Sequence, residues 1–216
     1  MIDVKCFSDN LMSENCFFVT DSKSGFSFVV DPGAECKELE ETIERYGVEK
    51  LRYILLTHGH FDHIGNTARL KEKYPHAKIV IAEQDSPFTN NDSLNLSFHF
   101  DDTIDHFDAD ITVNDGDVLP IGESNITVIS TPGHTRGSVC YQIDDVLFTG
   151  DTLMHGTMGR TDFPSGSSRE MSESLKKLGD LSGDYKIYCG HGSSSTLENE
   201  RIYNCYMRSF SDDDIY

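Results

Sequence analysis

The pattern of apolar and polar residues along the chain predicts a mixed α/β fold. Continuous apolar or β-branched runs predict strands at residues 15–19, 26–30, 51–56, 78–82, 126–129, 139–143, 146–148 and 185–189. Apolar residues at helical spacing predict helices at residues 36–46, 64–74, 171–178 and 196–208. Ser167 and Glu170 have capping-box spacing ahead of the third helix. Repeated strand, helix, strand units favour layered α/β architecture.

Residues 84–117 interrupt this pattern with acidic and amide side chains and only isolated apolar residues. We expect a loop or short helices lying over an edge of the fold, and we assign the acidic cluster no role because such clusters are usually solvated faces. A chain of 216 residues is long enough to bury a substantial core. The sequence therefore predicts one domain, residues 1–216.

Charge and composition limit the classes of binding partner and the location that we expect for this chain. The chain has 18 basic and 37 acidic side chains, a formal charge of −19 and a pI near 4.6, which disfavours nucleic acid. We expect no membrane contact, because no apolar run approaches ~18 residues. Met1 is not followed by a basic and then an apolar region, so a cytoplasmic location is expected. The six scattered cysteines, none in a C-x-x-C pair, are interpreted as reduced and mostly packing residues, with Cys16, Cys140 and Cys189 beside predicted strands expected to be buried.

The segment from Thr57 to His63 concentrates metal-binding side chains directly after the predicted strand at 51–56. Its candidate ligands are His58, His60, Asp62 and His63. Neutral imidazole is the commonest metal ligand in proteins, and carboxylates join it on ions such as Zn²⁺, Mn²⁺ and Fe²⁺. Alternate residues of extended backbone point the same way, so one pair can serve one ion and the adjacent Asp-His pair a second. Gly59 lets the backbone pass close to an ion.

Three further candidates follow other predicted strands beside a glycine: His134, Asp151 and His191. In layered α/β folds the loops at strand ends converge, so these side chains can join the first cluster. Five histidines and two aspartates suit two adjacent ions if one carboxylate bridges them. The remaining histidines, His76, His99 and His106, are interpreted as surface residues, and His155 as a residue that can line the site without binding metal.

These motifs, in this order, resemble the metal-binding motifs of the metallo-β-lactamase superfamily. Three more segments, at residues 31–34, 137–141 and 159–164, are similar to the glyoxalase II (hydroxyacylglutathione hydrolase) branch. The resemblance implies a four-layer αβ/βα sandwich of two mixed β-sheets flanked by helices, with the metals at one edge. Residues 159–164 are expected to form a buried turn in which Arg160 and Asp162 pair with backbone or supporting groups.

The resemblance also implies a ligand set. His58, His60 and His134 would hold the first metal, and Asp62, His63 and His191 the second, with Asp151 bridging. Two divalent ions are expected, with zinc favoured and iron or manganese able to use the same donors. Such a pair would activate a bridging water as hydroxide to attack a thioester carbon, and the catalytic residue Asp62 would also orient this nucleophile.

The substrate is less defined than the chemistry. Longer glyoxalase II enzymes have a C-terminal helical region that supplies basic residues to glutathione, whereas 25 residues follow His191 here (216 − 191), with Arg201 and Arg208 the basic ones. S-lactoylglutathione is the leading named substrate, and a smaller or different thioester is the alternative. The alternatives are a mononuclear iron persulfide dioxygenase using His58 or His60 with His134 and Asp151, a hydrolase of another ester, lactone, β-lactam or phosphodiester, and a non-enzymatic metal-binding domain.

Overall fold

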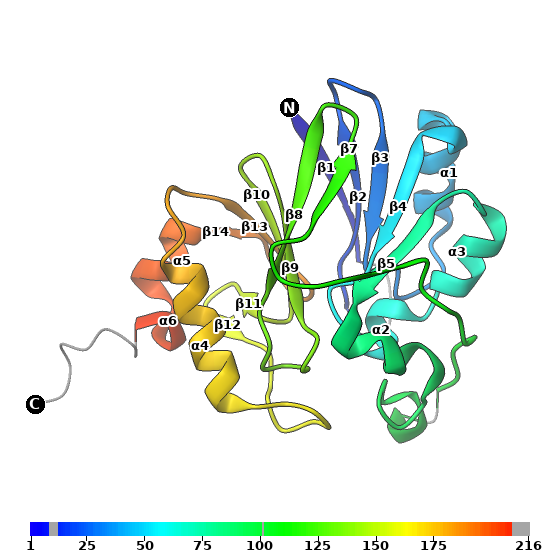
Figure 1. The fold of residues 1–216 in the computed structure, drawn as a ribbon. Helices are drawn as coiled ribbons and strands as arrows, with labels where there is room; N and C mark the ends of the chain where they lie inside the picture. The colour runs from blue at the N-terminus through cyan, green and yellow to red at the C-terminus, as the bar shows by residue number, and fades with distance from the viewer. Residues whose placement is uncertain (9–12, 101, 209–216) are drawn as a thin grey trace, which may run out of the picture.

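A computed structural model describes residues 1–8, 13–100 and 102–208, so Asp101 of the acidic segment lies outside the described residues. Two six-stranded mixed sheets pack face to face, and helices cover both outer faces (Figure 1). This arrangement confirms the predicted αβ/βα sandwich.

The first sheet is built from the N-terminal half of the chain. In spatial order it contains β1 (Ile2–Phe7), β2 (Cys16–Asp21), β3 (Ser27–Val30), β4 (Leu51–Leu55), β5 (Lys78–Ala82) and β6 (Ile111–Val113). The pairs β1–β2 and β2–β3 are antiparallel, and β3 to β6 are parallel. Connections on the outer face include α1 (Lys37–Tyr46), η1 (Val48–Lys50), α2 (Phe61–Ile64) and α3 (Thr67–Lys73), while η2 (Glu83–Asn90) and η3 (Ser97–Phe100) lead to β6. Parallel strands end at one edge, and the histidine loop begins there, directly after β4.

The second sheet is built from the C-terminal half. In spatial order it contains β7 (Val118–Ile121), β8 (Ser124–Ser130), β9 (Val139–Ile143), β10 (Val146–Gly150), β13 (Lys186–Cys189) and β14 (Ser195–Thr196). Only β10 and β13 are parallel, and α4 (Ser168–Gly179) connects them. The remaining elements are the hairpin β11 (Leu153–Met154) and β12 (Thr157–Met158), then α5 (Leu197–Tyr203) and α6 (Cys205–Arg208).

Successive side chains along a strand point to opposite faces of its sheet, and this alternation produces three apolar layers. Along β2, Phe17 and Val19 point between the sheets, whereas Cys16 and Phe18 pack beneath the helices of the first outer face. Phe148 also packs between the two sheets, and the centroid of its ring lies 5.5 Å from that of Phe17. Each fully buried apolar side chain contributes about 1.5–3 kcal/mol. The sandwich is therefore held from both sides of each sheet, and the strand ends that carry the candidate site are fixed by this packing.

Two predicted helices are each divided in the structure. The helix predicted at residues 64–74 is replaced by α2 and α3, because the Asn66 N–H bonds to the Pro32 carbonyl at 2.9 Å and the chain bends toward that turn. The helix predicted at 196–208 is interrupted at Asn204, where the backbone is extended and the side-chain amide bonds the carbonyls of Met154 and Thr157. In both places tertiary hydrogen bonds override helical periodicity.

Other expectations have mixed outcomes. β1 was not predicted, although Ile2, Val4 and Cys6 alternate with Asp3 and Lys5 as expected of a half-buried strand. The six cysteines, all among the described residues, form no disulfide. Cys16, Cys140 and Cys189 are buried as expected of packing residues, whereas Cys6 and Cys205 are exposed. The described part of residues 84–117 contains loops and the short helices η2 and η3, as expected, and also the edge strand β6, which was not expected. Among the described residues no helix is long and apolar enough to cross a membrane.

The capping interaction at the start of α4 can be tested by replacing the capping residue. Ser167 is the N-cap, and its Oγ accepts a hydrogen bond from the Glu170 N–H at 3.3 Å. Ser167→Ala should lower the free energy of unfolding by about 1 kcal/mol. Chemical denaturation measures this loss, with Ser172→Ala as the control on the exposed face of the same helix. Equal stability of the two variants would contradict the cap.

Candidate metal centre

The seven residues predicted from the sequence converge at one edge of the sandwich. His58 and His60 follow β4, Asp62 and His63 lie in α2, and the other three follow strands of the second sheet: His134 after β8, Asp151 after β10 and His191 after β13. They form three groups in which the donor atoms lie within 4.8 Å of one another: His58, His60 and His134; His58, His63 and Asp151; Asp62, His63 and His191. The site thus depends on both sheets.

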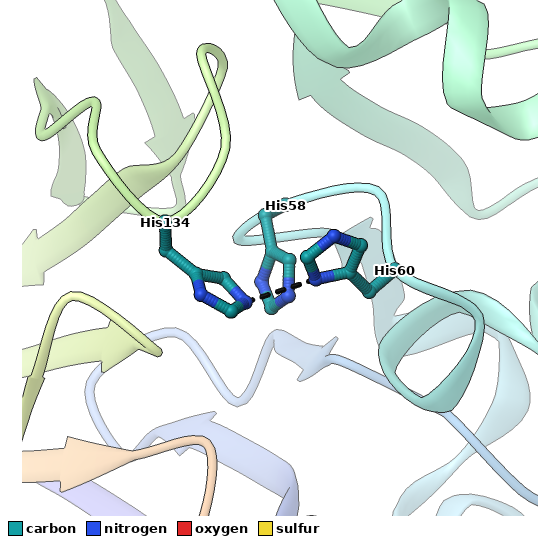
Figure 2. A group of neighbouring side chains, drawn as sticks. All are labelled: His58, His60 and His134. Carbon is teal, nitrogen blue, oxygen red and sulfur yellow. Dashed lines mark hydrogen bonds between the residues drawn. The ribbon is translucent and has the colours of Figure 1, made fainter. Parts of the chain in front are cut away.

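The first group consists only of imidazoles. His58 and His60 come from the loop after β4, and His134 faces them from the loop after β8 (Figure 2). His60 Nδ1 lies 2.9 Å from His134 Nε2, and the His58 ring is 4.8 Å from each of the other two rings. Two nitrogens bound to one tetrahedral ion at 2.0–2.1 Å are about 3.3 Å apart, so this spacing is close to that of a metal site.

The second group adds carboxylates. His63 Nε2 lies 3.3 Å from His191 Nε2, and Asp62 Oδ2 lies 3.4 Å from His191 Nε2. Asp151 stands between the groups, because its Oδ2 is 3.5 Å from His134 Nε2 and 3.6 Å from His191 Nε2. One carboxylate oxygen therefore approaches both groups.

Buried hydrogen bonds orient two of the imidazoles from behind through Asp31. His63 Nδ1 donates to Asp31 Oδ2 at 3.0 Å, which turns His63 Nε2 toward the cluster. Thr57 donates its hydroxyl to the same oxygen at 2.6 Å and its N–H to Oδ1 at 2.7 Å. His58 Nδ1, 3.1 Å from Thr57 Oγ1, can donate to that hydroxyl. Asp31 thereby fixes two rings at once.

A backbone carbonyl orients the third ring. His134 Nδ1 donates to the carbonyl of Arg160 at 2.7 Å. The expectation of a buried turn at residues 159–164 is wrong, because Arg160, Asp162 and Pro164 are exposed. Arg160 forms a bidentate pair with Asp162, at 2.7 Å in both contacts, instead of pairing with supporting groups. The loop still contacts the site through its backbone.

Burial and charge set the protonation of the cluster. Burial and the neighbouring imidazoles lower the pKa values of His58 and His60 well below the ordinary range, so both are neutral as metal binding requires. Burial opposes charge on His63, yet Asp62, Asp151 and Asp31 raise its pKa well above the ordinary value. Burial also opposes ionisation of Asp62, but His63 and His191 lower its pKa. The carboxylates thus favour a cation at the second group.

Two buried atoms test whether a metal fits here. His58 Nε2 and Asp151 Oδ1 have no hydrogen-bond partner among the described residues. Buried polar groups are rarely left unsatisfied, and bound ions are one explanation when they are. Neutral imidazoles and carboxylates are also suitable donors for Zn²⁺ and related ions. The residues present therefore fit a metal centre.

Close backbone packing is required around the ligands. A Cβ on Gly190 would overlap Asp151 Oδ1 and the ring of His63. At Gly59 the close neighbour is the side chain of Phe88, so this glycine is required for packing and not for approach to an ion as expected. The remaining histidines lie elsewhere: His76, His99 and His106 are exposed as predicted, and exposed His155 has its Nδ1 3.8 Å from Glu200.

Asp85 is a site residue that the sequence analysis missed, since it lies in the acidic segment assigned no role. It is fully buried and accepts hydrogen bonds from the Gly59 N–H at 2.9 Å, the Thr135 hydroxyl at 2.6 Å and the Gly137 N–H at 2.8 Å. Burial raises its pKa to about 6 against the opposing effect of these donors. Asp85 joins the loop of His58 and His60 to the loop of His134.

The fold and the site identify the family. The chain matches the model of the metallo-β-lactamase superfamily over residues 9–191 and belongs to that superfamily, whose members are generally metal-dependent hydrolases. It is 33% identical to the hydroxyacylglutathione hydrolase GloC of Haemophilus influenzae, over 92% of this chain and 94% of that protein. It is 36% identical to a hydroxyacylglutathione hydrolase of Rhodopseudomonas palustris, over 87% of this chain and 64% of that longer protein.

Solved structures agree with this assignment. BLEG-1, a B3 metallo-β-lactamase, has a TM-score of 0.86 at 27% identity, covering 96% of this chain and 99% of its own. TTHA1623, solved in a di-iron-bound form, has a TM-score of 0.82 at 26% identity, covering 94% and 100%. ETHE1 from Myxococcus xanthus has a TM-score of 0.74 at 25% identity, covering 94% and 83%.

Removal of Asp85 should destabilise the junction of the two loops. Asp85→Ala leaves three buried donors without their acceptor, and each such loss costs about 1–3 kcal/mol, so we expect at least about 3 kcal/mol less stability. Urea denaturation measures the change. Asp105→Ala, on an exposed acidic residue of the same segment, should stay within about 0.5 kcal/mol of wild type. A comparable effect of both variants would show that Asp85 does not join the loops.

Proposed function

We propose that the protein is a binuclear metal-dependent thioesterase of the hydroxyacylglutathione hydrolase type. His58, His60 and His134 would hold one ion and Asp62, His63 and His191 the other. The observation that carries the proposal is the position of Asp151, whose Oδ2 approaches both His134 and His191. Zinc is the favoured metal, and iron or manganese suit the same donors.

The chemistry follows from this donor set. When bound, two ions supply a water of lowered pKa as nucleophile and polarise the carbonyl under attack. Asp62, whose carboxylate is held ionised beside His63 and His191, can accept a hydrogen bond from that water and orient it. A thiolate is a good leaving group, so no strong general acid is required of the chain.

Similarity to named relatives supports the substrate class. Hydroxyacylglutathione hydrolases from two bacteria are 33% and 36% identical to this chain, and the Haemophilus influenzae protein is matched over nearly its whole length. A thioester of glutathione is therefore the proposed substrate, with S-lactoylglutathione the first compound to test.

A second candidate is persulfide oxidation at a single iron. The similarity to ETHE1 favours it, and His58 or His60 with His134 and Asp151 can make a facial triad of two histidines and one carboxylate. The binuclear proposal is preferred because Asp62, His63 and His191 form a separate group with donor atoms equally close to one another.

Metal analysis coupled to a substrate panel separates these candidates. Purified protein should contain two ions per chain and lose turnover on chelation, and thioesters should be hydrolysed faster than lactones or a β-lactam. One iron per chain with oxygen consumption on glutathione persulfide would establish the second candidate instead. Faster turnover of the β-lactam than of any thioester would reassign the substrate class.

Replacement of Asp62 tests its proposed role in turnover. Asp62→Asn, saturated with metal, should lower kcat by about 100-fold or more, because the amide cannot accept the proton or carry the charge that orients the water. Steady-state kinetics and metal content measured on the same sample separate turnover from ion loss. His155→Ala is the matched control, since His155 is exposed beside Glu200 and should retain wild-type kcat. Near-normal kcat in the metal-replete Asp62 variant would remove Asp62 from the mechanism.

A further inference from the structure

His60 differs from its neighbours in what holds its ring. His63 and His134 each have a hydrogen-bond acceptor behind the ring, namely Asp31 and the Arg160 carbonyl, and Thr57 Oγ1 lies behind His58. Histidine ligands of metals almost always have such a partner. His60 contacts only His134 through Nδ1, and its Nε2 is buried without a polar partner among the described residues. Its orientation must come from something else.

Two phenyl rings lie against His60. The Phe88 ring centroid is 6.1 Å from that of His60 with the planes at 56°, and the Phe163 centroid is 5.7 Å away with the planes at 79°. Edge-to-face contacts at such distances are favourable and depend on ring orientation. Phe88 is fully buried and also covers Gly59, so it belongs to the core. Phe163 is only partly buried and reaches His60 from the loop after β12.

Two residues of the same loop hold Phe163 in place. The Arg160 guanidinium lies 3.9 Å from the centroid of the Phe163 ring, within range of a cation–π contact. Asp162 fixes that guanidinium through its two hydrogen bonds. Because the Arg160 carbonyl also accepts the hydrogen bond of His134, one short loop contacts both His60 and His134.

We propose that Phe163 is a positioning residue for the first metal ion, fixing the His60 ring by aromatic contact where its neighbours are fixed by hydrogen bonds. Arg160 and Asp162 hold Phe163 in place. The inference rests on the proposed role of His60 as a ligand, and it concerns this chain's own side chains and not the reaction. The second ion should be unaffected, because Phe163 packs against a ligand of the first ion, whereas the bridging Asp151 meets this loop through its backbone carbonyl, which accepts from the Gly159 N–H at 2.8 Å.

The test uses full-length protein and compares Phe163→Ala with Phe163→Tyr. Loss of the ring should weaken binding of one of the two zinc ions about tenfold, within the range known for groups that orient metal ligands, and leave the other ion unchanged. Tyrosine preserves the ring and should restore both affinities. Phe98→Ala removes a phenyl ring that is 68% exposed and should bind both ions as wild type does. Competition with a chromophoric chelator measures both affinities.

A second readout needs no metal. In chelator-treated protein, the ring ¹⁵N signals of His60 should be sharp in wild type and in Phe163→Tyr, and broadened in Phe163→Ala, with His63 unchanged. Equal His60 spectra and equal zinc affinities in wild type and Phe163→Ala would overturn the inference. Phe163→Leu, which retains apolar volume without a ring, replaces the alanine variant if thermal unfolding shows that the latter does not fold.

These outcomes separate the inference from the proposed function. Absence of thioester turnover would overturn the proposed function. The spectra of metal-free protein would still test the role of Phe163. Conversely, thioester turnover with two bound ions and unchanged His60 spectra in Phe163→Ala would overturn only the positioning role.

Discussion

The candidate site depends on one buried carboxylate, that of Asp31, more than on any single ligand. Its backbone has φ of 48°, a conformation that aspartate tolerates better than most residues, and its side chain is almost fully inaccessible. A buried charge is stable only when hydrogen bonds replace its water. Thr57 and His63 supply them, so satisfying Asp31 also folds the histidine loop onto the end of β3 and turns His63 toward the cluster.

Asp31 organises the loop that follows β4 in the first sheet, but three of the seven candidate ligands come from loops of the second sheet. His134, Asp151 and His191 follow strands that are held in register by their own hydrogen bonds and by a core that both sheets build. Asp85 adds a direct connection, because it binds backbone of the loop after β4 together with backbone and side chain of the loop after β8. Two buried carboxylates that are not candidate ligands therefore fix the distance between the groups that are.

Apolar periodicity predicted a mixed α/β fold, the resemblance to the metallo-β-lactamase superfamily implied the sandwich, and positions at strand ends led us to expect that the seven candidate ligands lie together. Imidazoles and carboxylates beside glycine at strand ends are chemically distinctive, and strong apolar runs mark β2, β4 and β5. Asp85 could not be predicted this way, because its role depends on burial beneath loops 26 and 50 residues distant in sequence, and an aspartate in an acidic segment gives no sign of burial. The helix interruptions at Asn66 and Asn204 could not be predicted for the same reason, because each depends on a hydrogen bond to a carbonyl remote in sequence.

The two groups at the site use different physical means to favour an ion. Asp62 and His63 lie in a field of carboxylates, so a cation there relieves repulsion between negative charges that burial makes unfavourable. The first group has only imidazoles, and the carboxylate near it is that of Asp151, whose Oδ2 lies 3.5 Å from His134 Nε2. With less electrostatic attraction, affinity there depends more on rings already pointing the right way. That difference is the reason for proposing that positions behind the first group, including Phe163 and the carbonyl of Arg160, would affect an ion that they do not touch.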